Sequence, residues 1–201
     1  MKKRLYLVRH GEKVRNIGDP PLTEKGILQA KDTGIYFKNQ RLQKIIASPS
    51  LRTRQTAEII ADALALEVTF SDLLKERANW GDNPIQDYET FLAMWQRASI
   101  NRDWTPQVGD SSRIAGERLN KLIKSLNNEA SQIILVTHAG TIADFLRNIF
   151  DDKQLDAKYL NFSQLKDDGI LDCSITILDF DTKTGKYKLI TLASIKHLSE
   201  I

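Results

Sequence analysis

Two of the three histidines in this chain lie directly after short apolar runs. His10 follows residues 5–8 and Arg9, and His138 follows residues 133–137. Such runs are typical of buried strands, and ligands of open α/β sheets bind beyond the carboxyl ends of parallel strands. We therefore expect both imidazoles to face one crevice, where they indicate histidine-based phosphoryl transfer.

Phosphoryl transfer requires a nucleophile, cations around the phosphate oxygens and an acid for the leaving group. His10 is the candidate nucleophile, because a neutral imidazole attacks phosphorus and later leaves readily from phosphohistidine. The side chains expected to supply positive charge or hydrogen bonds to the phosphate are Arg9, Asn16, Arg52 and His138. A carboxylic acid completes the set, and Glu76 is the first candidate.

The elements that must position these side chains alternate along the chain. Apolar runs predict strands near residues 5–8, 43–47, 68–70 and 133–137. Amphipathic segments predict helices that begin near Thr23, Leu51, Ser112 and Gly140. Residues 175–192 are expected to form a terminal hairpin. The alternation predicts a three-layer α/β/α sandwich with a mostly parallel central sheet, a single domain over residues 1–201.

Residues 71–109 depart from this regular alternation. They contain all three tryptophans and one expected helix, at residues 87–99. We interpret the segment as an insertion that covers the carboxyl edge of the sheet as a lid. For the tryptophans themselves, packing beneath a long connection is favoured over contact with a substrate.

The composition limits the class of function. The 201 residues carry a formal net charge of +3, from 29 basic and 26 acidic residues, without a dense basic block. No nucleic-acid partner is therefore expected, and no membrane span, because no apolar stretch approaches the roughly twenty residues that cross a bilayer. The single cysteine, Cys173, favours a reducing, cytoplasmic location. The spacing of histidines and cysteines matches no metal site, so neither a metal nor another cofactor is expected.

Four sequence blocks occur in the order of the expected strands and helices. They are Arg9-His10-Gly11-Glu12 with Asn16, Pro21-Leu22-Thr23-Glu24-Lys25-Gly26, Ser48-Pro49-Ser50-Leu51-Arg52-Thr53-Arg54, and Thr137-His138-Ala139-Gly140. Together the blocks resemble the histidine phosphatase superfamily, which has the phosphoglycerate mutase-like fold. A single Arg-His-Gly would be weak evidence, whereas four blocks in register at strand and helix boundaries are specific.

The resemblance implies a role for each matching residue. It implies that His10 is transiently phosphorylated and that Glu76 donates the proton, with Glu89 and Asp82 as alternative donors. The implied phosphate-binding residues are Arg9, Asn16, Arg52, His138 and Ala139. Lys13 and Ala139 stand where Thr and Gly are common in the family, which bears on the substrate more than on the reaction.

The resulting prediction is a metal-independent phosphomonoesterase that hydrolyses a small phosphate ester through phosphohistidine on His10. A phosphatase is preferred to a mutase because the chain is compact, whereas mutases of this family tend to be longer. Three alternatives stay open: phosphoglycerate mutase-type phosphoryl transfer, a protein phosphohistidine phosphatase, and a non-catalytic phosphate-binding interaction module. The sequence does not indicate the oligomeric state.

Overall fold

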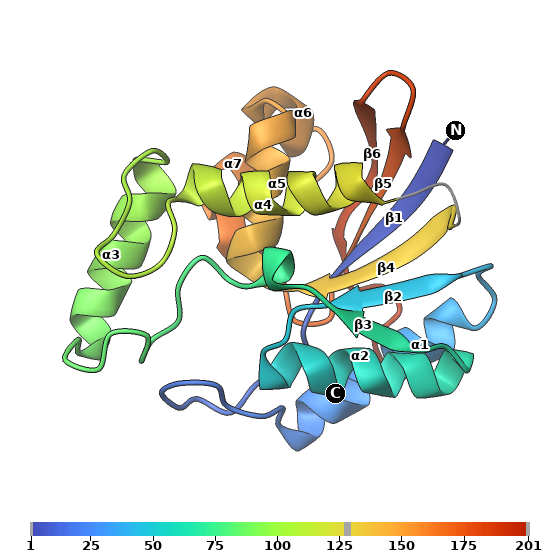
Figure 1. Cartoon of the computed structure of the whole chain (residues 1–201), viewed down its shortest axis with the longest axis horizontal. Helices are drawn as coiled ribbons and strands as arrows, with labels where there is room; N and C mark the ends of the chain where they lie inside the picture. The colour runs from blue at the N-terminus through green and yellow to red at the C-terminus, as the bar shows by residue number, and fades with distance from the viewer. Residues whose placement is uncertain (1, 127–129, 200–201) are drawn as a thin grey trace.

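One central sheet organises the molecule (Figure 1). The computed structural model describes residues 2–126 and 130–199, and within them six strands lie in the order β3-β2-β4-β1-β5-β6. The strands are β1 (Lys2–Arg9), β2 (Lys44–Ala47), β3 (Val68–Phe70), β4 (Gln132–Thr137), β5 (Ile175–Asp181) and β6 (Lys186–Ser194). No helix in this described part of the chain is long and apolar enough to cross a membrane.

The sheet is mostly parallel, as the sequence predicts. β1 pairs in parallel with β4, and β2 pairs in parallel with both β4 and β3. β5 and β6 form the expected antiparallel hairpin, and β5 runs antiparallel to β1. Arg9 lies opposite Thr137 at the carboxyl ends of the neighbouring strands β1 and β4. His10 and His138 therefore leave adjacent strands at the same edge of the sheet.

Helices cover both faces of the sheet, which confirms the three-layer prediction (Figure 1). These helices are α1 (Glu24–Phe37) and α2 (Leu51–Leu64) on one face, opposite α4 (Ser112–Ser125) and α5 (Ala139–Ile149) on the other. Side chains of β1 alternate between two buried clusters, with Leu5 and Leu7 on the α4–α5 side and Tyr6 and Val8 on the α1–α2 side. Burial on both faces explains why the apolar run of this strand is unbroken.

Residues 71–109 contain the 3₁₀ turn η1 (Asp72–Leu74) and helix α3 (Tyr88–Ile100), close to the predicted helix. The Asp87 side chain caps α3 by accepting the backbone N–H of Thr90. In Figure 1, α3 lies beyond the carboxyl ends of the central strands. The placement is compatible with a lid, and the lid role stays a prediction.

Sequence analysis did not predict three short elements between β4 and β5. They are α6 (Asp152–Asp156), α7 (Phe162–Leu165) and η2 (Lys166–Gly169). A capping box holds α6, since the Asp151 side chain accepts the N–H of Gln154 and the Gln154 side chain accepts the N–H of Asp151. Elements this short carry too few residues to show a periodic apolar pattern.

Candidate active site

His10 occupies the first position after β1, and its imidazole is buried. Its Nδ1 lies 2.8 Å from the carbonyl oxygen of Gly11, which only accepts, so Nδ1 carries the proton. The Nε2 lone pair accepts the Nε–H of Arg52 at 3.2 Å. Burial, followed by the charges of Arg52 and Arg9, holds the pKa of His10 well below 6.5. His10 is therefore a neutral imidazole whose Nε2 carries a lone pair instead of a proton, which is the form a nucleophile needs.

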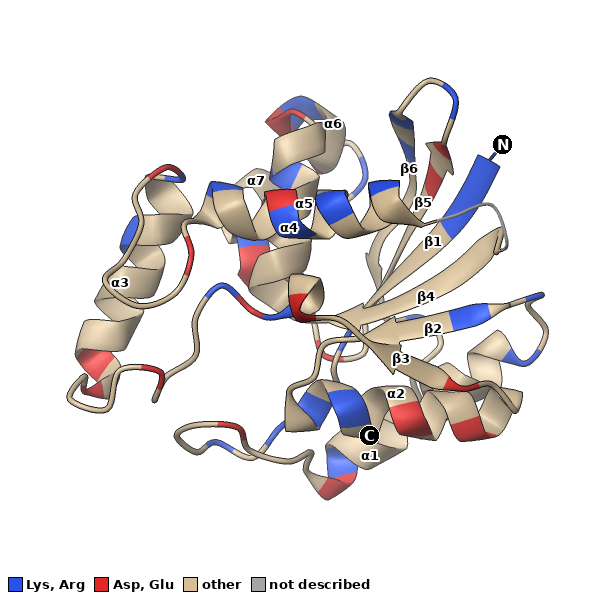
Figure 2. Cartoon of the chain, viewed as in Figure 1, with Lys and Arg blue, Asp and Glu red and all other residues tan. Residues whose placement is uncertain are grey.

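The guanidinium of Arg52, on the first turn of α2, links both histidines. Its Nη2 donates to Nδ1 of His138 at 3.0 Å and to Oδ1 of Asn79 at 2.7 Å, while Nη1 forms an ion pair with Asp19 at 3.2 Å. Burial lowers the pKa of Arg52, although the charges of nearby carboxylates oppose that shift. The amino-terminal turn of α2 is basic in Figure 2. Such a cation at a helix N-terminus favours binding of an anion beside it.

His138 occupies the N-cap position of α5 without a side-chain capping hydrogen bond, and it is fully buried. Because Arg52 can only donate to its Nδ1, the proton lies on Nε2, which is 2.9 Å from Oγ of Ser48. Burial, Arg52 and His10 hold the pKa of His138 well below its usual value. The structure thus corrects one expectation: His138 supplies a neutral hydrogen-bonding group rather than positive charge. The rings of His10 and His138 are 5.4 Å apart between centroids.

Arg9 and Lys13 bring further positive charge to the same edge. Arg9 forms a 2.9 Å ion pair with Asp172 and donates to the carbonyl of Ile170 at 2.6 Å. Its buried Nε has no hydrogen-bond partner among the described residues. Lys13 is half-buried, and its pKa is lowered by burial and by the charges of Arg52 and Arg9. Sequence analysis noted Lys13 as a departure from the family pattern that bears on the substrate, and it missed Asp172 as a neighbour of the site.

Asn16 and Ala139 occupy different surroundings. Asn16 lies on the exposed loop after β1, where its Oδ1 accepts the N–H of Ile17 at 2.8 Å. This local bond is typical of Asn in turns, so the expected hydrogen bond from Asn16 to phosphate stays a prediction. Ala139 is the first residue of α5. Its backbone N–H belongs to the end of the helix where anions are stabilised.

Glu76 is fastened to the N-terminus of α5. Its Oε2 accepts the backbone N–H of Gly140 at 3.0 Å, and its Oε1 accepts the Thr141 hydroxyl at 3.1 Å and the backbone N–H of Arg77 at 2.9 Å. His138 is the N-cap residue of α5, two residues before Gly140, so the bond to Gly140 places the Glu76 carboxyl group near the histidines. The structure therefore brings the first predicted acid to the site.

The alternative acids are placed differently. Glu89 is exposed on the first turn of α3. Asp82 is also exposed, and its Oδ2 accepts the backbone N–H of Asn79, the residue that contacts Arg52. Asp82 is thus linked to Arg52 through Asn79, although it lies on a surface loop.

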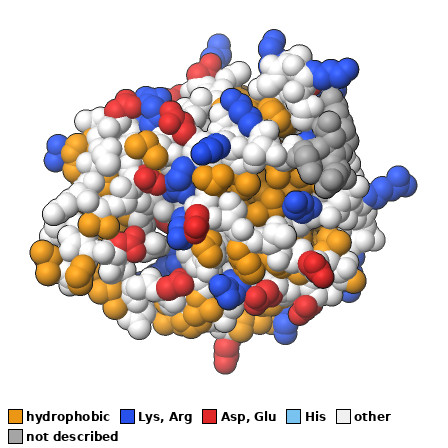
Figure 3. Space-filling model, in the orientation of Figure 1, with side chains coloured by type: hydrophobic (Ala, Val, Ile, Leu, Met, Phe, Trp, Pro, Cys, Tyr) orange, Lys and Arg blue, Asp and Glu red, His pale blue; other side chains and the backbone are white. Residues whose placement is uncertain are grey.

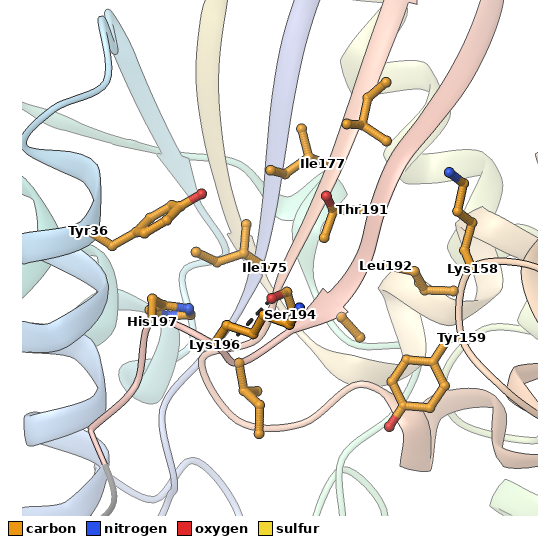
Figure 4. A pocket seen from close by; sticks show the side chains of 13 residues that line it. Tyr36, Lys158, Tyr159, Ile175, Ile177, Thr191, Leu192, Ser194, Lys196 and His197 are labelled. Carbon is orange, nitrogen blue, oxygen red and sulfur yellow. Dashed lines mark hydrogen bonds between the residues drawn. The ribbon is translucent and has the colours of Figure 1, made fainter.

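Two hollows differ in their relation to this site. A cleft of about 560 Å³ lies beside Glu76 and Asn79 and is lined by charged side chains. A larger one, of about 670 Å³, lies at β5 and β6, between Tyr36 and Lys158 (Figure 4). Its lining contains none of the predicted site residues. The smaller cleft has Glu76 in its lining, whereas His10 belongs to the lining of neither hollow. Within the described residues no cluster of three metal-ligating side chains is found.

A match that extends over most of the sequence identifies the protein family. Residues 5–192 match the family described as the histidine phosphatase superfamily (branch 1). The chain belongs to this superfamily. A protein named "Probable phosphoglycerate mutase GpmB" from Yersinia pestis is 31% identical over an alignment of 159 positions that covers 72% of this chain and 74% of the relative.

Solved structures of the superfamily share the fold. Bacillus stearothermophilus YhfR has a TM-score of 0.74 and 23% identity, with 98% of this chain and all (100%) of that chain covered. A mycobacterial glucosyl-3-phosphoglycerate phosphatase, in complex with inorganic phosphate, has a TM-score of 0.72 and 20% identity, with 98% and 100% covered. The phosphoglycerate mutase-like fold predicted from the sequence is thereby confirmed.

Proposed function

We propose that this chain is a metal-independent phosphomonoesterase that hydrolyses a small phosphate ester through a phosphohistidine on His10. The observation that carries the proposal is the state of His10: a buried, neutral imidazole whose Nε2 lone pair points at the guanidinium of Arg52. A phosphate that binds Arg52 at this place lies directly in front of the nucleophile. The buried Nε of Arg9 offers a further donor.

The proposed reaction has two steps. In the first, Nε2 of His10 attacks phosphorus, the bond to the ester oxygen breaks, and protonated Glu76 gives its proton to the leaving alcohol. In the second, water attacks the phosphohistidine, Glu76 takes one proton from that water, and His10 and inorganic phosphate are released. Throughout, Arg52 donates hydrogen bonds to the phosphoryl oxygens, and Arg9 balances their charge.

Phosphoglycerate mutase activity is the second candidate, because the Yersinia relatives carry that name. A mutase and a phosphatase share the phosphohistidine and differ in the acceptor, which is phosphoglycerate in one and water in the other. The solved structures with this fold include proteins titled as phosphatases of glucosyl-3-phosphoglycerate and of phosphoserine. These names support hydrolysis of a small ester. The cytoplasmic location expected from the single cysteine stays a prediction.

Hydrolysis of p-nitrophenyl phosphate in excess EDTA, with and without vanadate, tests the proposal. Native protein is expected to turn over in EDTA and to be inhibited by vanadate, whereas His10→Ala loses activity by about three orders of magnitude or more. His197→Ala is the matched control, since His197 lies at the larger hollow and bonds Thr33. Full activity in His10→Ala, or inhibition by EDTA, would contradict the mechanism.

The acceptor is tested separately with labelled monophosphoglycerate. Release of labelled inorganic phosphate is expected for the phosphatase. Transfer of label between monophosphoglycerates, stimulated by the bisphosphate, would establish the mutase instead.

A further inference from the structure

A buried ion pair lies immediately behind Glu76 and takes no part in the chemistry described above. Nη1 of Arg77 lies 3.2 Å from Oδ1 and 2.9 Å from Oδ2 of Asp144, and the two side chains are 2% and 1% exposed. Ser112 Oγ also donates to Oδ1 of Asp144. Burying two charges costs desolvation that their attraction only partly returns, so such a pair is weak evidence for stability. Its position therefore calls for another explanation.

The same face of α5 holds both Glu76 and Arg77. The Gly140 N–H and the Thr141 hydroxyl bind the Glu76 carboxylate, and Asp144, one helical turn later, binds the guanidinium of Arg77. Two consecutive residues are thus fastened to one rigid helix at two separate points. Removing the second point leaves the Arg77 guanidinium fastened to α3 alone and no longer to α5.

Arg77 also joins this segment to α3. Its Nη2 donates to Oγ of Ser99 at 2.5 Å and to the carbonyl of Trp95 at 3.3 Å, and its Cζ lies 3.6 Å from the centre of the Trp95 ring. Trp95 in turn packs at Gly140, where an added Cβ would lie 2.6 Å from Oε1 of Glu76 and 2.8 Å from the indole. The Glu76 carboxyl group and the Trp95 indole therefore pack closely together beside Gly140. A shift of Arg77 would move both side chains.

We propose that Asp144 is a positioning residue for phosphoryl transfer: by fixing Arg77 against α5, it holds the Glu76 carboxyl where the leaving oxygen is protonated. This inference rests on the proposed role of Glu76 as the acid. Asp144 itself stays behind Arg77 and touches no substrate. Misplacement of a reacting group by about 1 Å costs on the order of 100-fold in rate. Loss of Asp144 should therefore slow the step that needs the acid without removing the nucleophile.

The test compares kcat/KM for phenyl phosphate and p-nitrophenyl phosphate in Asp144→Asn. The two esters have similar shapes, but the phenyl leaving group is more basic and depends more on the acid. We expect kcat/KM to fall about 100-fold on phenyl phosphate and less than about fivefold on p-nitrophenyl phosphate. Equal losses on both esters, or no loss on either, would overturn the positioning role.

Two further variants separate positioning from folding. Leu119→Ala removes a buried side chain from α4 in the same core, so it should lower stability and keep the native ratio of the two kcat/KM values. If Asp144→Asn does not fold, the double variant Arg77→Met with Asp144→Leu removes both charges, a change that is often neutral for stability. It should show the same selective loss on phenyl phosphate, and a native ratio would refute the proposal.

The same measurement on Glu76→Gln tests the acid role of Glu76 separately from the positioning role of Asp144. If Glu76→Gln shows the selective loss and Asp144→Asn does not, only the positioning role fails. If Glu76→Gln lacks the selective loss, the acid assignment fails and the positioning role falls with it. If the native protein hydrolyses neither ester, the proposed function fails first.

Discussion

Arg52 controls the protonation of both histidines in the site. It donates to Nε2 of His10 and to Nδ1 of His138, so each lone pair already faces a cation and a second proton is disfavoured. Burial acts in the same direction on both imidazoles. A phosphate dianion bound to Arg52 would offset its charge and make room for positive charge to develop on His10 during transfer. Without substrate, His10 thus stays neutral and able to attack. A bound phosphate then supplies the negative charge that offsets Arg52.

Glu76→Gln should separate the acid from the nucleophile. The amide keeps the size of the side chain and loses the proton, so we expect kcat/KM for alkyl or phenyl phosphate to fall by about 100-fold or more. The loss on p-nitrophenyl phosphate should be smaller, because nitrophenolate leaves without a proton. Glu89→Gln, an exposed carboxyl on α3, is the control and should change neither rate. Equal losses on all esters in Glu76→Gln would remove it from the acid role.

The contrast between predicted and missed residues has a physical origin. His10, Arg52 and His138 could be predicted because strand ends and helix starts are visible in a sequence, and parallel strands bring those ends together. The contacts of Ser48 and Asp172 could not be predicted, because their partners, His138 and Arg9, lie far away in the sequence and are brought close only by packing. The neutral state of His138 was also hidden, because burial and the approach of Arg52 exist only in the folded chain.

At the scale of elements, the pairing register of β1 and β4 brings the two histidines together, which their positions in the sequence alone do not ensure. The parallel pairing of Arg9 with Thr137 puts the residues that follow them side by side, and a slip by one residue would turn His138 to the other face. The long helices and central strands were predicted because their apolar patterns are long or unbroken. The turns of residues 152–169 were not, because their conformation depends on local caps and on contacts such as that of Asp167 with Trp95.

The contact between α1 and the loop after β1 makes a prediction for Gly26. A Cβ at Gly26 would overlap the carbonyl oxygen of Glu12, so the backbone must move two residues after His10. We expect Gly26→Ala to lower kcat/KM on p-nitrophenyl phosphate by about tenfold or more, because the nucleophile is displaced. The measurement is steady-state kinetics, with circular dichroism to confirm the fold.

Gly34→Ala provides the matched control on the same helix. Its Cβ would meet Ala63 of α2 at 2.9 Å, away from the loop that carries His10. It should therefore alter thermal stability and leave kcat/KM near the native value. A normal rate in Gly26→Ala, or an equal loss in Gly34→Ala, would show that the α1 contact does not position His10.

At the scale of the whole molecule, charge is mixed on the surface and concentrated at the site. Basic and acidic side chains are interspersed over the face shown in Figure 3, in line with the small net charge of +3. By contrast, Arg9, Lys13 and Arg52 act on one another and on His10 at the carboxyl edge of the sheet. A local cluster of this kind attracts a small phosphate without the basic surface that a nucleic acid needs.

Burial of two neutral histidines should also be measurable in the stability of the whole fold. The pKa values of His10 and His138 are lowered on folding from 6.5, so below pH 6.5 the unfolded chain binds more protons and the free energy of unfolding falls with falling pH. Each imidazole contributes up to about 1.4 kcal/mol per pH unit. Burial raises the pKa of Asp144 from 3.8 to about 6 and also raises those of Asp168 and Asp172, and these carboxyl groups act in the opposite direction. Burial lowers the pKa of His197, which therefore acts in the same direction as His10 and His138. Urea unfolding should therefore show a free energy of unfolding that declines from pH 7 to pH 5, and the decline should be shallower in His138→Gln. A urea midpoint that does not change with pH would show that the histidines are not held neutral.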